Sequence, residues 1–137
     1  MELLEEHLKE LGRYLEVWKR YKKEVKFRDF YENIDVQNMV LYCMFVAIQS
    51  AIDVANDIIV MKSLEEPSTY RESFEILRKN KIIPERLAKN LMALARFRNI
   101  IAHLYFRVDA EKAYRVLKIG DKHLEEFFKI VRKSAKK

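Results

Sequence analysis

The chain has 137 residues, enough for one domain with a buried core and too few for two. Half of the residues are hydrophobic and 35% are charged, which is the composition of a folded rather than a disordered protein. With only two Gly and two Pro, the composition argues against hairpin-rich β folds. The two glycines, Gly12 and Gly120, are too far apart for a Gly-rich phosphate loop. We therefore expect a single all-α domain over residues 1–137, made of long helices with few connections.

The net charge and the cysteine content limit which binding partners and which cellular compartment fit this chain. Lys and Arg exceed Asp and Glu by 27 − 21 = 6. The excess gathers near the end, at Lys129, Arg132, Lys133, Lys136 and Lys137. A basic balance permits a polyanionic partner such as RNA, although a solubilising helix end is the commoner reason for such a cluster. The single cysteine, Cys43, excludes an intrachain disulfide and fits a core thiol in a reducing cytoplasm.

The N-terminal half of the chain predicts two long helices. The first runs from about Leu3 to Val25, followed by a bend over residues 26–33 with Asn33 or Asp35 as the next N-cap. Its apolar positions recur every three or four residues, at Leu4, Leu8, Leu11, Leu15 and Trp18. The longest apolar run, Met39 to Ile48, is shorter than the roughly 20 residues that span a bilayer, so we expect no membrane segment.

The second helix, about Val36 to Lys62, is apolar on most of its circumference. Two apolar stripes leave one polar band, which contains Asn38, Gln49, Asp53 and Asn56. Such a helix must be buried on several sides. It is either the centre of the domain or shared between the core and a subunit interface.

Three further helices complete the expected bundle. Thr69 and Glu72 have the spacing of a capping box and start a short helix that ends near Arg78. A fourth helix covers about residues 84–104, and Asp109 caps a last one that runs towards the C-terminus. The inward positions of these last two helices are Leu87, Leu91, Leu94 and Ile101, then Ala113, Leu117, Leu124, Phe128 and Val131. Four long helices and one short one predict an up-and-down four-helix bundle.

The end of the fourth helix carries an Arg-x4-His-x-Tyr pattern, made of Arg98, His103 and Tyr105, with Asn99 after the arginine. At 100° per residue, Arg98 and Tyr105 share a helix face to within about 20°, whereas His103 lies about 140° from Arg98. A site that uses Arg98 and His103 together needs the helix to loosen, the long arginine to reach round, or a second chain to complete it.

With this motif, the chain resembles the HepT toxins of the HEPN/MNT toxin–antitoxin pairs. Residues 51–56 and 68–74 support the resemblance, which covers nearly the whole chain. It implies a homodimer or a higher oligomer with the HEPN fold, in which two copies of the motif face one cleft. It also implies a metal-independent endoribonuclease toxin, without a cofactor, that cuts tRNA or mRNA. The implied partner is an MntA-like nucleotidyltransferase antitoxin, which silences the toxin by transferring AMP to Tyr105.

The motif residues suit RNA cleavage by the 2′-hydroxyl. Histidine suits the proton transfers because imidazole as a side chain type ionises near neutral pH, which makes His103 the candidate acid or base. Arg98 has a guanidinium that binds two phosphate oxygens and stays charged. Asn99 could donate to a phosphate oxygen, fix the imidazole ring, or be a plain surface residue. His7 and His123 lack a His or Cys partner at helical spacing and are read as structural. The competing interpretation is a non-catalytic helical dimer that binds a nucleotide or scaffolds a nucleotidyltransferase.

Overall fold

The computed structural model describes residues 2–135. In this part of the chain the elements are all helical. They are α1 (Glu2–Glu24), α2 (Phe27–Glu32), α3 (Ile34–Met61), α4 (Tyr70–Lys79), α5 (Glu85–Leu104), the 3-10 turn η1 (Tyr105–Arg107) and α6 (Ala110–Ala135). The predicted all-α, up-and-down bundle is therefore confirmed.

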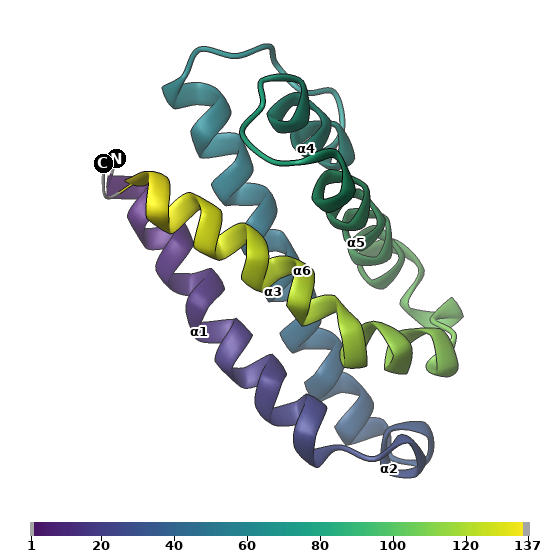
Figure 1. The fold of residues 1–137 in the computed structure, drawn as a ribbon. Helices are drawn as coiled ribbons and strands as arrows, with labels where there is room; N and C mark the ends of the chain where they lie inside the picture. Colours follow the sequence, from purple (N-terminus) through teal and green to yellow (C-terminus); the bar gives the residue numbers. More distant parts are fainter. Residues whose placement is uncertain (1, 136–137) are drawn as a thin grey trace.

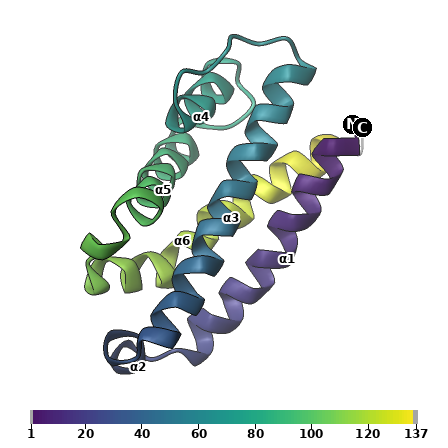
Figure 2. The same ribbon diagram turned by 180° about the vertical axis from the view of Figure 1, so that it is seen from behind.

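Helix α3 occupies the middle of the bundle. It packs against α1 on one side, against α4 and α5 on the other, and against α6 (Figures 1 and 2). The start of α1 and the end of α6 lie side by side in both views. This placement explains why α3 is apolar round most of its circumference, because neighbours cover it on three sides.

The apolar composition of α3 makes it the one described helix that is long and hydrophobic enough to cross a membrane. However, 61% of its most apolar window is buried inside the bundle, as in the core helix of a soluble protein. Its large apolar side chains that remain exposed are Ile34, Met39, Tyr42, Val60 and Met61.

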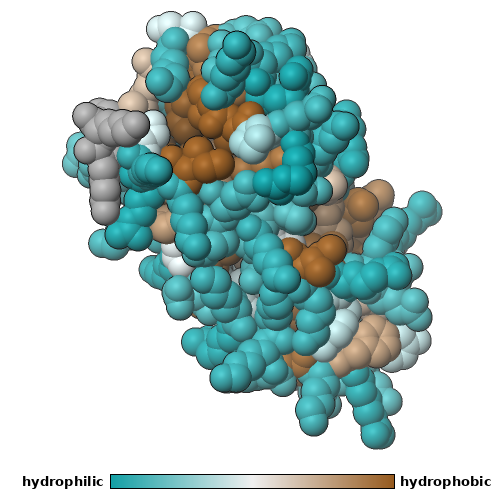
Figure 3. All heavy atoms as spheres, viewed as in Figure 1, coloured by the Kyte–Doolittle hydropathy of each residue, from teal (hydrophilic) through white to brown (hydrophobic). Residues whose placement is uncertain are grey.

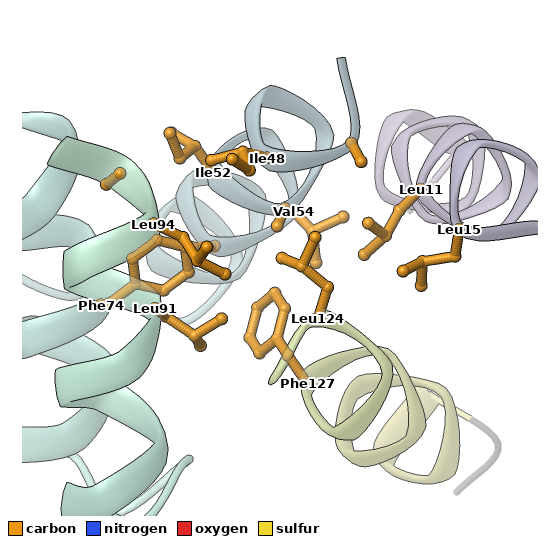
Figure 4. Close-up of a cluster of buried hydrophobic side chains, with 14 of the residues drawn as sticks. Leu11, Leu15, Ile48, Ile52, Val54, Phe74, Leu91, Leu94, Leu124 and Phe127 are labelled. Atoms are coloured by element: carbon orange, nitrogen blue, oxygen red, sulfur yellow. The ribbon is translucent and has the colours of Figure 1, made fainter. Parts of the chain in front are cut away.

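The core lies between α3 and the four helices around it (Figure 4). Phe74 and Phe127 meet edge to face there, with ring centroids 5.6 Å apart. Trp18 is fully buried, and its Nε1 donates a hydrogen bond to the carbonyl oxygen of Leu117 at 2.8 Å. At Gly120 an added Cβ would lie 2.9 Å from the Trp18 ring, so glycine is what lets α6 approach α1 this closely.

Helix boundaries and caps agree with the sequence pattern to within about two residues. Asn33 Oδ1 accepts from the amides of Asp35 and Val36, which decides between the two expected N-caps. The expected caps at Thr69 and Asp109 also accept amide hydrogen bonds from the first turns of α4 and α6.

Two details of the prediction are wrong. The expected bend over residues 26–33 contains the short helix α2, which buries Phe30. Its N-cap residue makes no side-chain hydrogen bond, so the sequence has no capping pattern that would mark the start of this helix. On α6, Phe127 is fully buried, whereas Phe128 is only partly buried against the core, because the buried positions after Leu124 follow at three and seven residues. Of the basic C-terminal cluster, Arg132 and Lys133 lie in the last turn of α6, and Lys136 and Lys137 lie outside the described residues.

Candidate functional site

The predicted site residues sit where α5 ends. Arg98, Asn99 and His103 belong to the last two turns of the helix, and Tyr105 begins the 3-10 turn η1. The helix stops because Leu104 leaves helical geometry, with φ −133° and ψ 39°. The projection that puts Arg98 and Tyr105 on one helix face therefore does not apply. Tyr105 is instead 73% exposed on a separate short segment.

Arg98 is held from four directions. Its Nε donates to Oε1 of Gln49 on α3 at 2.8 Å, and one terminal nitrogen donates to Oδ1 of Asn99 at 3.0 Å. The guanidinium carbon also lies 4.8 Å from the ring centroid of Phe45 and 4.7 Å from that of Tyr70. Two amides and two aromatic rings therefore fix the orientation of this cation.

The partners of Arg98 are uncharged. Within the described residues, none of the ion pairs includes Arg98. Its nearest link to a carboxylate runs through Gln49, whose Nε2 donates to Oδ1 of Asp53 at 2.9 Å. This bond turns the carbonyl oxygen of Gln49 towards Arg98. These contacts therefore fix the position of the guanidinium without pairing it with a carboxylate. Its positive charge can still bind an anion.

Asn99 and His103 are four residues apart on α5 and line the same pocket of about 470 Å³. The pocket is completed by Asn56 of α3, by Pro67, Ser68 and Thr69 between α3 and α4, and by Tyr70 and Ser73 of α4. Arg98 donates to Asn99 and so contacts a residue of the pocket that contains His103. Which of the three ways unites Arg98 with His103 stays a prediction.

Polar side chains of α3 find partners on the neighbouring helices α4 and α1. Asn56 Oδ1 accepts from the Ser73 hydroxyl at 2.6 Å, and Asp57 Oδ2 lies 2.6 Å from Nδ1 of His7. His7 therefore has a structural partner. Cys43 is buried, and burial raises the pKa of its thiol to about 12, so it is the core thiol expected.

Three neighbours of Arg98 were not singled out by the motif. Gln49, Phe45 and Tyr70 lie 49, 53 and 28 residues away from it in the sequence, and they meet it only through the packing of α3 and α4 on α5. The one sequence signal is the place of Gln49 in the polar band of an otherwise apolar helix.

Other surface features lie away from the motif. A hollow of about 570 Å³ opens beside the last turns of α3 and α6, lined mainly by Leu4, Ile58, Met61, Ile82, Ile130 and Val131. Figure 3 shows an apolar patch near the top of a largely hydrophilic face, with smaller apolar areas lower on the same face. Across residues 2–135, His, Cys, Asp and Glu side chains do not gather in threes that could hold a metal ion.

Comparison with known proteins places the chain in a family. The model of the Ribonuclease HepT-like family matches residues 5–133. The mRNA nuclease HepT of Shewanella oneidensis is 30% identical over 98 residues, which are 72% of this chain and 71% of that protein.

Two solved structures share the fold. The tri-AMPylated HEPN toxin of S. oneidensis, in complex with MNT antitoxin, gives a TM-score of 0.87 at 21% identity, over 96% of this chain and 98% of that one. The cytosolic protein YutE of Bacillus subtilis gives 0.82 at 20% identity, over 96% and 87%. By sequence and by fold, this chain belongs to the Ribonuclease HepT-like family.

Proposed function

We propose that this protein is a metal-independent endoribonuclease toxin of the cytoplasm, with Arg98, His103 and Asn99 at its catalytic site. The observation that carries the proposal is the Arg98 cation, fixed by neutral partners and joined through Asn99 to a pocket that contains the exposed His103. Family membership supports a ribonuclease, and the S. oneidensis relative is named an mRNA nuclease. The substrate is RNA, either mRNA or tRNA.

The chemistry is an attack by the substrate's own 2′-hydroxyl. His103 of one protomer accepts the hydroxyl proton, the 2′-oxygen bonds to phosphorus, and the bond from phosphorus to O5′ breaks. The partner subunit's His103 donates a proton to the leaving O5′. Arg98 binds the non-bridging oxygens as negative charge grows on them. The products are a 2′,3′-cyclic phosphate and a 5′-hydroxyl.

A homodimer supplies the second histidine. Large apolar side chains are exposed on the two helices that build the site, at Met39, Tyr42, Ile100 and Leu104. Exposed apolar groups that flank a polar site are typical of an interface. We assign them to a contact between two copies of this chain, which brings the two motifs to one cleft.

The proposed control is AMPylation of Tyr105 by an MntA-like nucleotidyltransferase antitoxin. The tyrosine hydroxyl oxygen bonds to the α-phosphorus of ATP, and pyrophosphate and the hydroxyl proton leave. The related S. oneidensis structure is of a tri-AMPylated toxin with MNT antitoxin, and Tyr105 is exposed near the end of the catalytic helix. The added phosphates carry negative charge to the place where RNA phosphates dock, which opposes substrate binding.

The test is RNA cleavage in excess EDTA by the wild-type protein and by His103→Ala and Arg98→Ala. We expect the wild type to cut RNA to cyclic-phosphate ends, and each variant to lose roughly 100-fold or more of the rate. Arg96→Ala is the matched control, because Arg96 is an exposed arginine on the same helix, two residues away.

The alternative outcomes are distinct. If the wild type and both variants are equally inert on RNA, the protein is the non-catalytic helical dimer that binds a nucleotide or scaffolds a nucleotidyltransferase. If both variants cut as fast as the wild type, the activity belongs to another site. Loss of cleavage after incubation with the antitoxin and ATP, which Tyr105→Phe prevents, would support the modification.

A further inference from the structure

A strip of cations follows the first turns of α6. Its members recur at steps of three or four residues and are Lys112, Arg115, Lys118 and Lys122. These steps keep all four on the side of the helix that faces away from the buried Ala113 and Leu117. At 1.5 Å of rise per residue the strip is about 15 Å long, so it offers more than a single anion site.

The charges of this strip are not cancelled by acidic residues. Among the described ion pairs, none includes a member of the strip. Lys118 Nζ donates instead to the carbonyl oxygen of Lys22 at 2.7 Å and lies 5.1 Å from the ring centroid of Tyr114. Glu111 is the only acidic residue between positions 110 and 120. The strip therefore keeps a net positive charge for a ligand.

The end of α1 adds positive charge beside this strip. The Tyr114 hydroxyl donates to the carbonyl oxygen of Val25 at 2.8 Å, which fixes the end of α1 against the start of α6. Lys23 and Lys26 lie within two residues of this contact and are exposed. Neither lysine belongs to a described ion pair, and Glu24 is the one acidic residue between them. We call the strip together with Lys23 and Lys26 the basic patch.

The basic patch lies next to the proposed catalytic site along the chain and in space. Helix α5 ends at Leu104, the turn η1 covers Tyr105–Arg107, and α6 begins at Ala110. Figures 1 and 2 both show the start of α6 beside the end of α5. An RNA strand held at the end of α5 therefore meets this part of α6 as it continues over the surface.

The chemistry of the patch favours a phosphate backbone over a protein surface. On the described part of α6, Ile119 is the one large apolar side chain that is exposed. Protein interfaces usually have an apolar centre, which this strip lacks. A row of Lys and Arg side chains instead binds successive phosphates and releases the counterions that surround a nucleic acid.

We propose that the basic patch binds the phosphate backbone of the RNA that flanks the cleaved bond. The inference rests on the proposed ribonuclease function and adds a second RNA-binding surface to the catalytic site. Because its contacts are to phosphates, the patch contributes affinity for a long RNA and no selection of sequence.

The first test measures binding without cleavage. A 2′-O-methyl RNA oligonucleotide lacks the attacking hydroxyl, so its affinity can be followed by fluorescence anisotropy at several salt concentrations. The patch variant carries Lys112→Gln, Arg115→Gln and Lys122→Gln, three exposed positions. We expect its affinity to fall roughly tenfold or more, and the slope of log K against log salt to fall by about 2.

The matched control carries Lys9→Gln, Lys62→Gln and Lys89→Gln. These lysines are also exposed and lie in the first halves of α1 and α5 and just after α3, away from the patch. The control has the same net charge as the patch variant, so it separates a local contact from the overall charge of the protein. We expect it to keep the wild-type salt slope, with both variants folded by circular dichroism.

The second test separates binding from chemistry. On a long RNA we expect the patch variant to have a KM raised roughly tenfold, with kcat unchanged. On a dinucleotide substrate, which has no flanking phosphates, it should match the wild type. Arg98→Ala should instead lower kcat on both substrates.

Each outcome decides between the proposals. If RNA is cut and the patch variant binds and cuts it like the control, the patch is overturned while the nuclease stands. If RNA is not cut but binding depends on the patch and on salt, the nuclease fails and the RNA-binding surface stands. A wild type that does not bind the oligonucleotide overturns the patch. So does a patch variant that binds RNA normally but no longer retains the antitoxin in a pull-down, because the surface then serves a protein partner.

Discussion

Charged side chains are held in two different ways in this molecule. Between α1 and α6, Lys22 Nζ lies 3.0 Å from Asp121 Oδ1, and Lys19 Nζ lies 3.0 Å from Glu125 Oε2. At the end of α5, Arg98 is held by Gln49 and by other groups that carry no charge. The first arrangement cancels charge and fastens two helices together, whereas the second aims a charge and leaves it available.

We expect the ion pairs between α1 and α6 to serve stability, and the unpaired charge at the end of α5 to serve function. A cation whose partner is a carboxylate gains little by binding a phosphate, because it must first give up that partner. A cation held by an amide oxygen and two rings has been oriented in advance and still attracts an anion. The two regions should therefore respond to substitution in opposite ways, one in unfolding and the other in catalysis.

Gln49→Glu should remove the difference and have the largest effect. It places a carboxylate where an oxygen now lies 2.8 Å from Arg98 Nε, and it converts the neutral arrangement into an ion pair. We expect RNA cleavage to fall roughly 100-fold. We expect thermal stability to fall as well, because the new carboxylate also faces Asp53 Oδ1, which accepts from Gln49 Nε2 at 2.9 Å in the wild type. Gln49→Ala, which loses the anchor but adds no charge, should cost about tenfold less. A Gln49→Glu protein as active as the wild type would contradict the argument.

Asp121→Asn should affect the other region alone. Asp121 is 5% exposed and accepts from Lys22 Nζ through both oxygens, at 3.0 and 3.3 Å. We expect about 2 kcal/mol less free energy of unfolding in urea, with RNA cleavage unchanged. Arg28→Ala breaks an exposed pair with Glu32 and should cost less than about 0.5 kcal/mol. Equal losses of unfolding free energy in the two variants would show that burial of the Lys22–Asp121 pair does not matter.

His123 on α6 should give the smallest effect, through pH. Burial lowers the pKa of His123 below its ordinary 6.5, and nearby Arg86 lowers it further, against the opposing charge of Glu126. As pH falls through 6.5, the unfolded chain binds the proton first, so stability is lost until the lower folded-state pKa is passed. His123→Gln should therefore lose less stability than the wild type between pH 7.5 and 5.5, measured by urea midpoints. An identical loss would contradict this.

The helices and the motif could be predicted because each is defined by residues that lie close together in the sequence. Apolar periodicity marks the buried face of α1, and the caps at Asn33, Thr69 and Asp109 mark helix starts. The helix α2 was not predicted because six residues are too few to show a period. Phe127 and Phe128 could not be told apart because both lie at helical spacing from Leu124, and packing decides between them.

The surroundings of Arg98 depend on tertiary packing instead. Gln49 is visible in the sequence as part of a polar band, but periodicity does not say which helix will cover that band. The angle of about 140° between Arg98 and His103 is correct for an ideal helix. It does not say how far the long side chain of Arg98 extends, nor what a second chain would bring to the site.

The ring of Tyr70 serves the arginine on one side and the pocket on the other. A molecule bound in the pocket and an anion bound by Arg98 would therefore have one side chain in common. If binding at either place changes the affinity of the other, the change is the same factor in both directions.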